Sequence, residues 1–196
     1  MSKTGIIILA AGNSTRMGEP KQLMMYKNKT FLQHIIDEAK NANLDPVICV
    51  TGYQSDLVTT SISTMEVSVV YNKHWSEGMG SGIATGIRYL LLSDADSVIL
   101  AVSDQPYVSS DLFRTIIHSK ENSGKGIIAC SYADTLGTPV LFVKDYFSQL
   151  QSLIGGEGAK KIVKANLSDV FQIEFEKGTV DIDTKEDYEN LISEIK

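Results

Sequence analysis

The stretch GIIILAAGNSTRMGEPK, residues 5–21, joins an apolar run to a loop of glycine, small polar and basic residues. The run Gly5–Ala11 has the length of a strand and no polar side chain, which indicates a strand buried on both faces. The loop can turn backbone N–H groups toward an anion and adds one arginine and one lysine. It matches neither a Walker A loop nor a dinucleotide fingerprint, because Gly12 and Gly18 stand at the wrong spacing. Taken alone, the loop is equally consistent with an anion site and with a solvated connector.

The rest of the chain alternates strand-like runs with helical patterns. Further strands are predicted at Pro46–Thr51, Val67–Tyr71, Ser97–Val102, Gly126–Cys130 and Thr138–Val143. Helices are predicted around Phe31–Ala39 behind an N-cap at Thr30, and over Ile83–Leu92, Ser110–Ser119, Asp145–Leu153 and Lys185–Ile195. Because several strands are apolar on both faces, we expect an α/β protein with three αβα layers and a Rossmann-like, mostly parallel mixed sheet. Residues 1–196 have the length of a single domain.

Composition narrows the class of protein. The formal net charge of −6 argues against a general nucleic-acid binder. Cys49 and Cys130 stand in apolar runs and are expected to be buried, inert thiols. No run reaches transmembrane length, and the N-terminal run opens into a polar loop where a signal peptide would have a cleavage site. We therefore expect a cytoplasmic protein with no membrane partner.

An aspartate follows one of the buried strands. In parallel sheets, sites lie at the carboxyl ends of strands, and Asp104 comes two residues after the run Ser97–Val102. An ionised carboxylate there needs a cation or several donors, and Mg²⁺ bridging the phosphates of a substrate would suit it. The alternative is a turn aspartate, since Pro106 favours a turn.

Two more segments carry candidate residues. Tyr71–Gly86 holds four glycines near a predicted helix start, a composition that suits close approach of backbone to a ligand. His74 and Trp75 lie in the same segment, and neither is assigned a role. Near the C-terminus, Asp183 is either part of a helix cap with Thr184 or a second metal ligand opposite Asp104.

Together these motifs resemble one family, the nucleotidyltransferases of molybdenum cofactor biosynthesis, and within it the molybdenum cofactor cytidylyltransferases, which serve enzymes such as xanthine dehydrogenase. The resemblance runs from Ile6 to about Leu191. It is carried, in order, by Leu9-Ala10-Ala11-Gly12-x-Ser14-x-Arg16-Met17-Gly18-x-x-Lys21, Thr51-Gly52, Asn72 with Gly78-Met79 and Gly86, Asp104-Gln105-Pro106, Gly137-x-Pro139-Val140-Leu141-Phe142 and Asp181-Ile182-Asp183-Thr184.

The resemblance implies a nucleotidyltransferase fold and an enzyme that uses CTP, Mg²⁺ and a molybdopterin-type acceptor. It implies catalytic roles for Arg16, Lys21 and Asp104, and Asp104 would bind the metal. The position of Asp183 makes it the expected second ligand, with Asp181 as the alternative. The residues that the resemblance implies for nucleotide binding are Leu9, Ala10, Ala11, Gly12, Ser14, Arg16, Lys21, Thr51, Gly52, Gly78, Gly80 and Ser81.

Two features bear on the substrates. Ala11 stands where the guanylyltransferase branch usually has glycine, so its methyl is expected to favour CTP. The family often has Gly-Asp-x-Gly-Ala-Arg where this chain has Gly155-Gly156-Glu157-Gly158-Ala159-Lys160, in a loop expected on the acceptor side. Alternatives are therefore GTP as donor, or a sugar or polyol phosphate as acceptor. A non-catalytic cofactor carrier or insertion chaperone is a further alternative, although a carrier has no need of Arg16, Lys21 and Asp104 together.

Overall fold

The computed structural model describes residues 3–13 and 20–195. Its strands and helices are, in chain order, β1 (Thr4–Ala10), the 3₁₀ helix η1 (Lys21–Leu23), β2 (Met25–Tyr26), β3 (Lys29–Thr30), α1 (Phe31–Asn41), β4 (Val47–Thr51), α2 (Ser55–Ser61), β5 (Ser68–Tyr71), η2 (Trp75–Glu77), α3 (Met79–Leu90), β6 (Ser97–Val102), α4 (Ser110–Ser123), β7 (Ile127–Tyr132), β8 (Thr135–Val143), η3 (Lys144–Tyr146), α5 (Phe147–Gln151), α6 (Lys160–Ala165), η4 (Leu167–Asp169), β9 (Val170–Glu174), η5 (Glu176–Thr179) and α7 (Lys185–Ile195).

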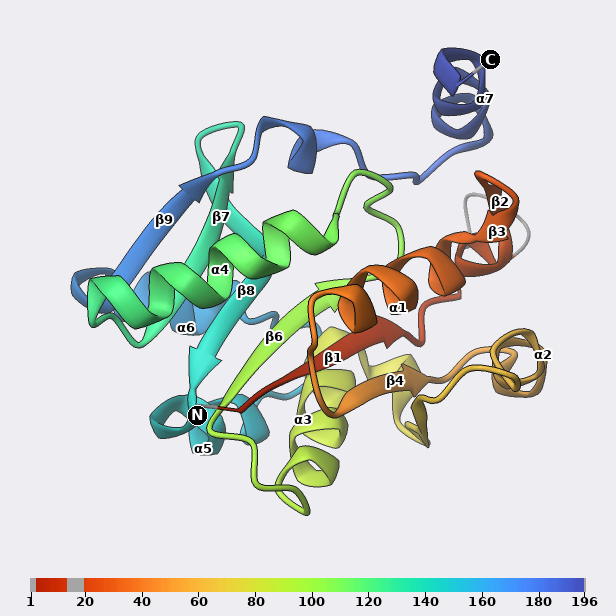
Figure 1. The fold of residues 1–196 in the computed structure, drawn as a ribbon. Helices are drawn as coiled ribbons and strands as arrows, with labels where there is room; N and C mark the ends of the chain where they lie inside the picture. The colour runs from red at the N-terminus through yellow and green to blue at the C-terminus, as the bar shows by residue number, and fades with distance from the viewer. Residues whose placement is uncertain (1–2, 14–19, 196) are drawn as a thin grey trace.

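A mostly parallel sheet organises these elements. Its described strands lie in the order β5-β4-β1-β6-β8-β7-β9, and β8 runs antiparallel to both of its neighbours. Helices α1 and α4 cover one face, and α3 and α5 lie on the other (Figure 1). The predicted three-layer α/β fold with a mixed, mostly parallel sheet is therefore confirmed.

Strand β1 separates two hydrophobic cores. Side chains alternate across a strand, so Ile6 and Ile8 pack with α1 and α4 on one face, whereas Ile7 packs with α3 and α5 on the other. All three are fully buried. The unbroken apolar run in the sequence thus reflects burial on both faces.

The sheet also has a topological switch point beside β1. From β1 the chain builds outward through β4 and β5, and then returns to add β6 on the opposite side of β1. The parallel register places Leu9 beside Val102, so the carboxyl ends of β1 and β6 lie together. Ligands of open α/β sheets bind in the crevice at such a point, and Asp104 follows β6 directly into it.

A third, small cluster attaches the C-terminal segment. It contains Tyr26, Phe31, Ile182 and Leu191 and joins the β2–β3 hairpin, α1 and α7. The backbone N–H of Ile182 donates to the carbonyl oxygen of Asp104 at 3.2 Å. These contacts bring residues near the C-terminus to the end of β6.

Helix starts follow the expected capping chemistry. The Thr30 hydroxyl accepts a hydrogen bond from the Gln33 N–H at 3.1 Å, and the Gln33 side chain accepts one from the Thr30 N–H at 2.9 Å. This capping box confirms Thr30 as the N-cap of α1. The Ser109 hydroxyl caps α4 through the Leu112 N–H.

The amino-terminal edge of the sheet carries paired charges of both signs. Lys3 pairs with Asp45 at 2.9 Å and with Asp94 at 2.6 Å, and Lys120 lies 3.8 Å from Asp96.

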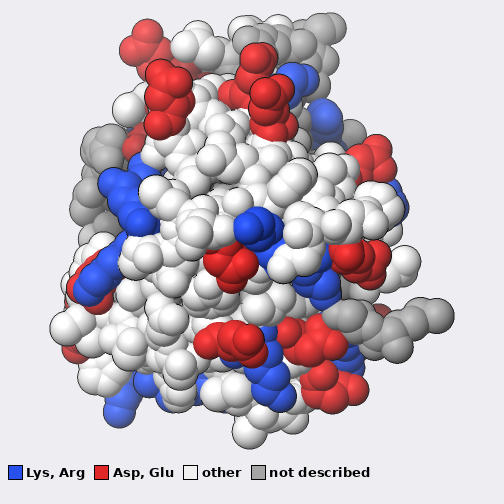
Figure 2. Space-filling view, turned by 90° about the vertical axis from the view of Figure 1, so that its left-hand side faces the viewer, with Lys and Arg blue, Asp and Glu red and all other residues white. Residues whose placement is uncertain are grey.

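Figure 2 shows the left-hand side of Figure 1, where acidic and basic side chains are interspersed with no broad patch of one sign. Among the described residues no helix combines the length and the apolar character that crossing a bilayer requires.

Helix α3 begins at Met79, four residues before the predicted start at Ile83. It contains Gly82 and Gly86, and the space around each glycine shows how closely the helix packs on its neighbours. A Cβ on Gly86 would lie 2.7 Å from Cγ2 of the buried Ile7, whereas a Cβ on Gly82 would meet its nearest neighbour at 3.5 Å. Overpacking costs about 1–3 kcal/mol, and alanine gains about 1 kcal/mol over glycine in a helix.

We expect Gly86→Ala to lower the free energy of unfolding by up to about 2 kcal/mol, measured by urea denaturation. Gly82→Ala is the matched control in the same helix and is expected to leave stability unchanged or to raise it. Equal stabilisation by both substitutions would show that α3 does not press on β1 at Gly86.

Candidate active site

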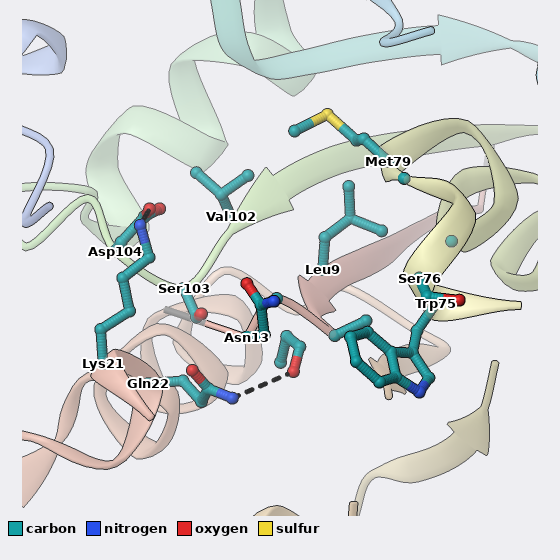
Figure 3. Close-up of a pocket in the computed structure, with 15 residues that line it drawn as sticks. Leu9, Asn13, Lys21, Gln22, Trp75, Ser76, Met79, Val102, Ser103 and Asp104 are labelled. Atoms are coloured by element: carbon teal, nitrogen blue, oxygen red, sulfur yellow. Dashed lines mark hydrogen bonds and ion pairs between the residues drawn. The ribbon is translucent and has the colours of Figure 1, made fainter. Parts of the chain in front are cut away.

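A cavity of ≈ 490 Å³ opens at the carboxyl ends of β1 and β6. Its walls come from the segment after β1, from η1, from the η2–α3 segment and from the end of β6 (Figure 3). The lining residues are Leu9, Ala10, Ala11, Gly12, Asn13, Lys21, Gln22, Trp75, Ser76, Gly78, Met79, Gly82, Val102, Ser103 and Asp104. The topological switch point therefore holds a pocket.

One end of the cavity is charged. The ammonium group of Lys21 lies between two carboxylates: it forms an ion pair with Asp104 Oδ2 and donates to Asp183 Oδ1 at 2.9 Å. Figure 3 shows the Lys21 and Asp104 side chains meeting at this end. Burial alone would lower the pKa of Lys21, but the charges of Asp104 and Asp183 outweigh it and raise the pKa above its ordinary value. Lys21 is therefore a cation at any physiological pH.

The second oxygen of Asp104 has a different environment. Asp104 Oδ1 is buried and has no hydrogen-bond donor among the described residues. Burying such an oxygen without a partner costs free energy, so the position suits a bound cation. The described residues contain no group of three or more His, Cys, Asp or Glu side chains that could hold a metal ion. Asp104 with Asp183 thus fits the Mg²⁺ mode in which one or two carboxylates bind and the substrate supplies further oxygens.

The Asp183 side chain contacts Lys21, whereas its backbone N–H joins the helix cap by donating to Asp187 Oδ2 at 3.2 Å. The cap of α7 forms between Thr184, whose hydroxyl accepts from the Asp187 N–H at 3.2 Å, and the Asp187 carboxylate, which accepts from the Thr184 N–H at 2.8 Å. The Asp183 carboxylate instead accepts from Lys21.

Burial, followed by the negative charge of Asp104, raises the pKa of neighbouring Asp181 to about 6, even though part of the residue faces solvent.

Gln105 connects the two acidic segments, a role that the sequence did not indicate. Its side chain is buried; the amide donates to the Gly178 carbonyl at 3.1 Å and its oxygen accepts from the Thr138 hydroxyl at 3.1 Å. The available signal was a polar residue three positions after a buried strand. Its hydrogen bond to Gly178 links the end of β6 to the segment that leads to Asp181 and Asp183.

The opposite end of the cavity is aromatic and apolar. Trp75 lies there, away from Lys21 and Asp104, with Met79 and Leu9 on the same side (Figure 3). A Cβ on Gly52 would lie 2.4 Å from the Cβ of Trp75 and 2.8 Å from that of Ala11, so both residues pack directly on Gly52. The sequence assigned no role to Trp75, because a loop tryptophan is compatible with simple packing.

Several predicted nucleotide-binding residues support this wall from behind. The Ser81 hydroxyl lies 2.8 Å from the carbonyl oxygens of both His74 and Gly78, and its one proton is shared between them. Thr51 is fully buried, with its hydroxyl 2.8 Å from that of Ser55, and the Gly80 N–H donates to a neighbouring loop. Like Gly52, none of these three lines the cavity, so the structure gives them a supporting position.

Most of the other residues predicted to bind the nucleotide or to act in catalysis lie together around the cavity. Leu9, Ala10, Ala11, Gly12, Lys21, Gly78 and Asp104 line the cavity. Ser14 and Arg16 lie outside the described residues.

The loop of residues 154–160, which contains the segment Gly155–Lys160 expected on the acceptor side, borders the cavity. The Gly80 N–H donates to the Gly155 carbonyl at 2.9 Å, and a Cβ on Gly158 would lie 3.4 Å from the sulfur of Met79, which lines the pocket. Glu157 pairs with Lys161 and accepts from the Ile154 N–H, so it closes its own loop. The loop is thus fastened to the first turn of α3 at the pocket rim.

Comparison with known proteins gives the family and the fold of the chain. The MobA-like NTP transferase domain matches residues 6–170. The chain is similar to Rv0371c from Mycobacterium tuberculosis H37Rv, at 29% identity and a TM-score of 0.81 over 98% of each chain. The complex of Rv0371c with manganese gives 28% identity and a TM-score of 0.78 over 98% of this chain and 99% of that one. A nucleotidyl transferase from Methanothermobacter thermautotroptrophicus shares the fold, at 21% identity and a TM-score of 0.82 over 98% and 97%.

The packing of Trp75 on Gly52 can be tested directly, because Trp75 is the one tryptophan of the chain. Gly52→Ala should force the indole to move, lower the free energy of unfolding by about 1–3 kcal/mol and shift the tryptophan emission. Gly12→Ala is the control, since its added Cβ meets no described atom within 4 Å. Unchanged emission in Gly52→Ala would contradict the packing of this wall.

Proposed function

The chain belongs to the MobA-like NTP transferase family, a family of nucleotidyltransferases, and we propose that it transfers CMP from CTP to the terminal phosphate of a molybdopterin-type cofactor, with release of pyrophosphate. The proposal is carried by a cavity with Lys21 and Asp104 at one end, where Asp183 contacts Lys21 from outside the lining, and an aromatic, apolar wall at the other end. That polarity matches a nucleoside triphosphate, whose charge lies at one end and whose base lies at the other.

In this proposal the triphosphate lies toward the charged end. Lys21 contributes a compact positive charge, and the backbone after β1 approaches the phosphates at Gly12, where no described side chain fills the space. Ser14 and Arg16 are proposed to complete this anion site. The nucleoside lies toward Ala11, Gly78 and Trp75.

Asp104 and Asp183 would hold a divalent cation, for which we propose Mg²⁺. The buried, donor-free oxygen of Asp104 supports the assignment, and the structural relative Rv0371c has been solved in complex with manganese. When bound, the cation supplies charge neutralisation at the phosphates during transfer.

The proposed reaction needs no general base. A terminal phosphate oxygen of the acceptor attacks the α-phosphorus, a new P–O bond forms, and the bond to the bridging oxygen of the β-phosphate breaks. Because the second pKa of a phosphate monoester is about 6, this nucleophile is already largely ionised near neutral pH. The residues of this chain therefore act by positioning the two substrates and stabilising charge.

The acceptor is proposed to enter beside the loop of residues 154–160, which borders the cavity at Met79. The molybdopterin identity rests on the order of motifs along the chain, and a client molybdoenzyme such as xanthine dehydrogenase would receive the product. Glu157 pairs with Lys161 in this loop, so the exposed Lys160 is the cation that remains for a phosphate of the acceptor.

Asp104→Asn tests the metal assignment, because it keeps the shape of the side chain and removes its charge. We expect turnover to fall at least a hundredfold, or about 3 kcal/mol in the barrier, in a pyrophosphate-release assay with Mg²⁺. The matched control is Asp94→Asn, which removes an exposed carboxylate paired with Lys3 at the far edge of the sheet. Near-normal turnover of a folded Asp104→Asn protein would refute the assignment.

We propose that base preference depends on Ala11 and Trp75, which both line the cavity and both pack on Gly52 behind it. In this proposal the Ala11 methyl limits the room for the base and disfavours a two-ring purine. Exclusion by one methyl is worth roughly 1–3 kcal/mol, so we expect a preference for CTP over GTP of tenfold to a hundredfold in a competition assay with molybdopterin cofactor as acceptor.

Ala11→Gly should reduce this preference and leave the dependence of the rate on Mg²⁺ concentration unchanged. Equal use of the two nucleotides by the unmodified protein, or preference for GTP, would show that Ala11 does not select the base.

A further inference from the structure

We propose that Lys21 occupies the place of the divalent cation in the nucleotide-free protein, and that a metal ion binds well only after a triphosphate has drawn the lysine away. The inference rests on the proposed function, because it assigns the triphosphate as the group that moves Lys21. It adds to that function an order of binding, in which the metal enters with the nucleotide.

The Lys21 ammonium lies where the metal is proposed to bind. The Lys21 ammonium contacts both Asp104 Oδ2 and Asp183 Oδ1, which are the two carboxylates proposed to hold the metal. One cation between two carboxylates leaves a single negative charge, and a divalent ion at the same place would face the positive charge of the lysine at close range. Lysine and metal therefore compete for the same oxygens.

Lys21 satisfies only part of the hydrogen-bonding capacity of the two carboxylates. A permanent structural bridge would be expected to satisfy the buried oxygens around it, because such oxygens are costly to leave without a partner. Asp104 Oδ1 is buried and has no hydrogen-bond donor among the described residues even while Lys21 is in place. The site is therefore better suited to an ion with several coordination positions than to one ammonium group.

The Lys21 side chain can move while its backbone stays. Neighbouring Gln22 is buried, and its amide donates to the Ala10 carbonyl at 3.3 Å, which anchors η1 to the end of β1 (Figure 3). The long, flexible lysine stem starts from this anchor and lines the cavity in which the phosphates are proposed to lie. A rotation of the side chain toward the phosphates would release both carboxylates.

The test is a titration of Mn²⁺ alone into the nucleotide-free protein, followed by the electron paramagnetic resonance signal of free Mn²⁺. Lys21→Met removes the ammonium and keeps a stem of similar length. We expect it to bind Mn²⁺ at least tenfold more tightly than the unmodified protein. Lys29→Met is the matched control, because it removes the same charge from an exposed pair with Asp37, and it should leave Mn²⁺ affinity unchanged.

The added affinity must also reside at this site. The double variant Lys21→Met/Asp104→Asn should lose it, and retention of tight binding would overturn the proposal, as would a gain below tenfold in Lys21→Met. If Lys21→Met does not fold, Lys21→Gln answers the same question with a neutral side chain that can still donate to a carboxylate.

The proposed function is tested separately by adding CTP to the unmodified protein in the presence of Mn²⁺. Absence of CTP binding would refute the function, whereas the nucleotide-free comparison of the lysine variants decides whether Lys21 holds the place of the metal.

Discussion

The burial of β1 on both faces is the constraint on which the rest of the structure depends. Ile6 and Ile8 anchor one core, Ile7 anchors the other, and β4 and β6 pair along the two edges of the strand. Because the strand is fixed on all four sides, its carboxyl end is a rigid point. The loop, the lysine and the wall of the cavity are all positioned from that end.

The charged end of the cavity shows how distant segments are brought together. Lys21 follows β1, Asp104 follows β6, and Asp183 lies close to the C-terminus, yet the three side chains meet. The backbone contact between Ile182 and Asp104, with the hydrogen bonds of Gln105, holds the last segment in place. The arrangement places one cation and two carboxylates at one end of a pocket whose other end is apolar, and the proposed orientation of the nucleotide rests on this difference between the two ends.

Sequence reasoning predicted the parts that depend on strong local patterns. The strand Ser97–Val102 and the helix Lys185–Ile195 were predicted with their observed bounds, and Thr30 was identified as a cap. Strand β9 and the short helices α2 and α6 were missed. Strand β9 is at least partly exposed along its length and forms the edge of the sheet, so it lacks the apolar run that marked the central strands.

The site was predictable in its charges and less so in its walls. Asp104 follows a buried strand closely, where a charge needs a partner, and Lys21 belongs to the glycine-rich, basic loop after another buried strand, so both could be recognised in the sequence. The resemblance could not separate residues that line the cavity from residues that support it, which is why Thr51 and Ser81 were grouped with Ala11 and Gly12. The position of Trp75 in the cavity wall depends on its contact with Gly52, and no local sequence pattern predicts such a tertiary contact.

The most direct test of the proposed CMP transfer is pyrophosphate release with each of the four nucleoside triphosphates, with and without molybdopterin cofactor, in the presence of Mg²⁺. We predict release that requires the cofactor and is fastest with CTP, with one pyrophosphate formed for each dinucleotide product. Absence of release with every nucleotide in the presence of the cofactor, while another phosphorylated acceptor supports it, would contradict the proposed transfer to molybdopterin.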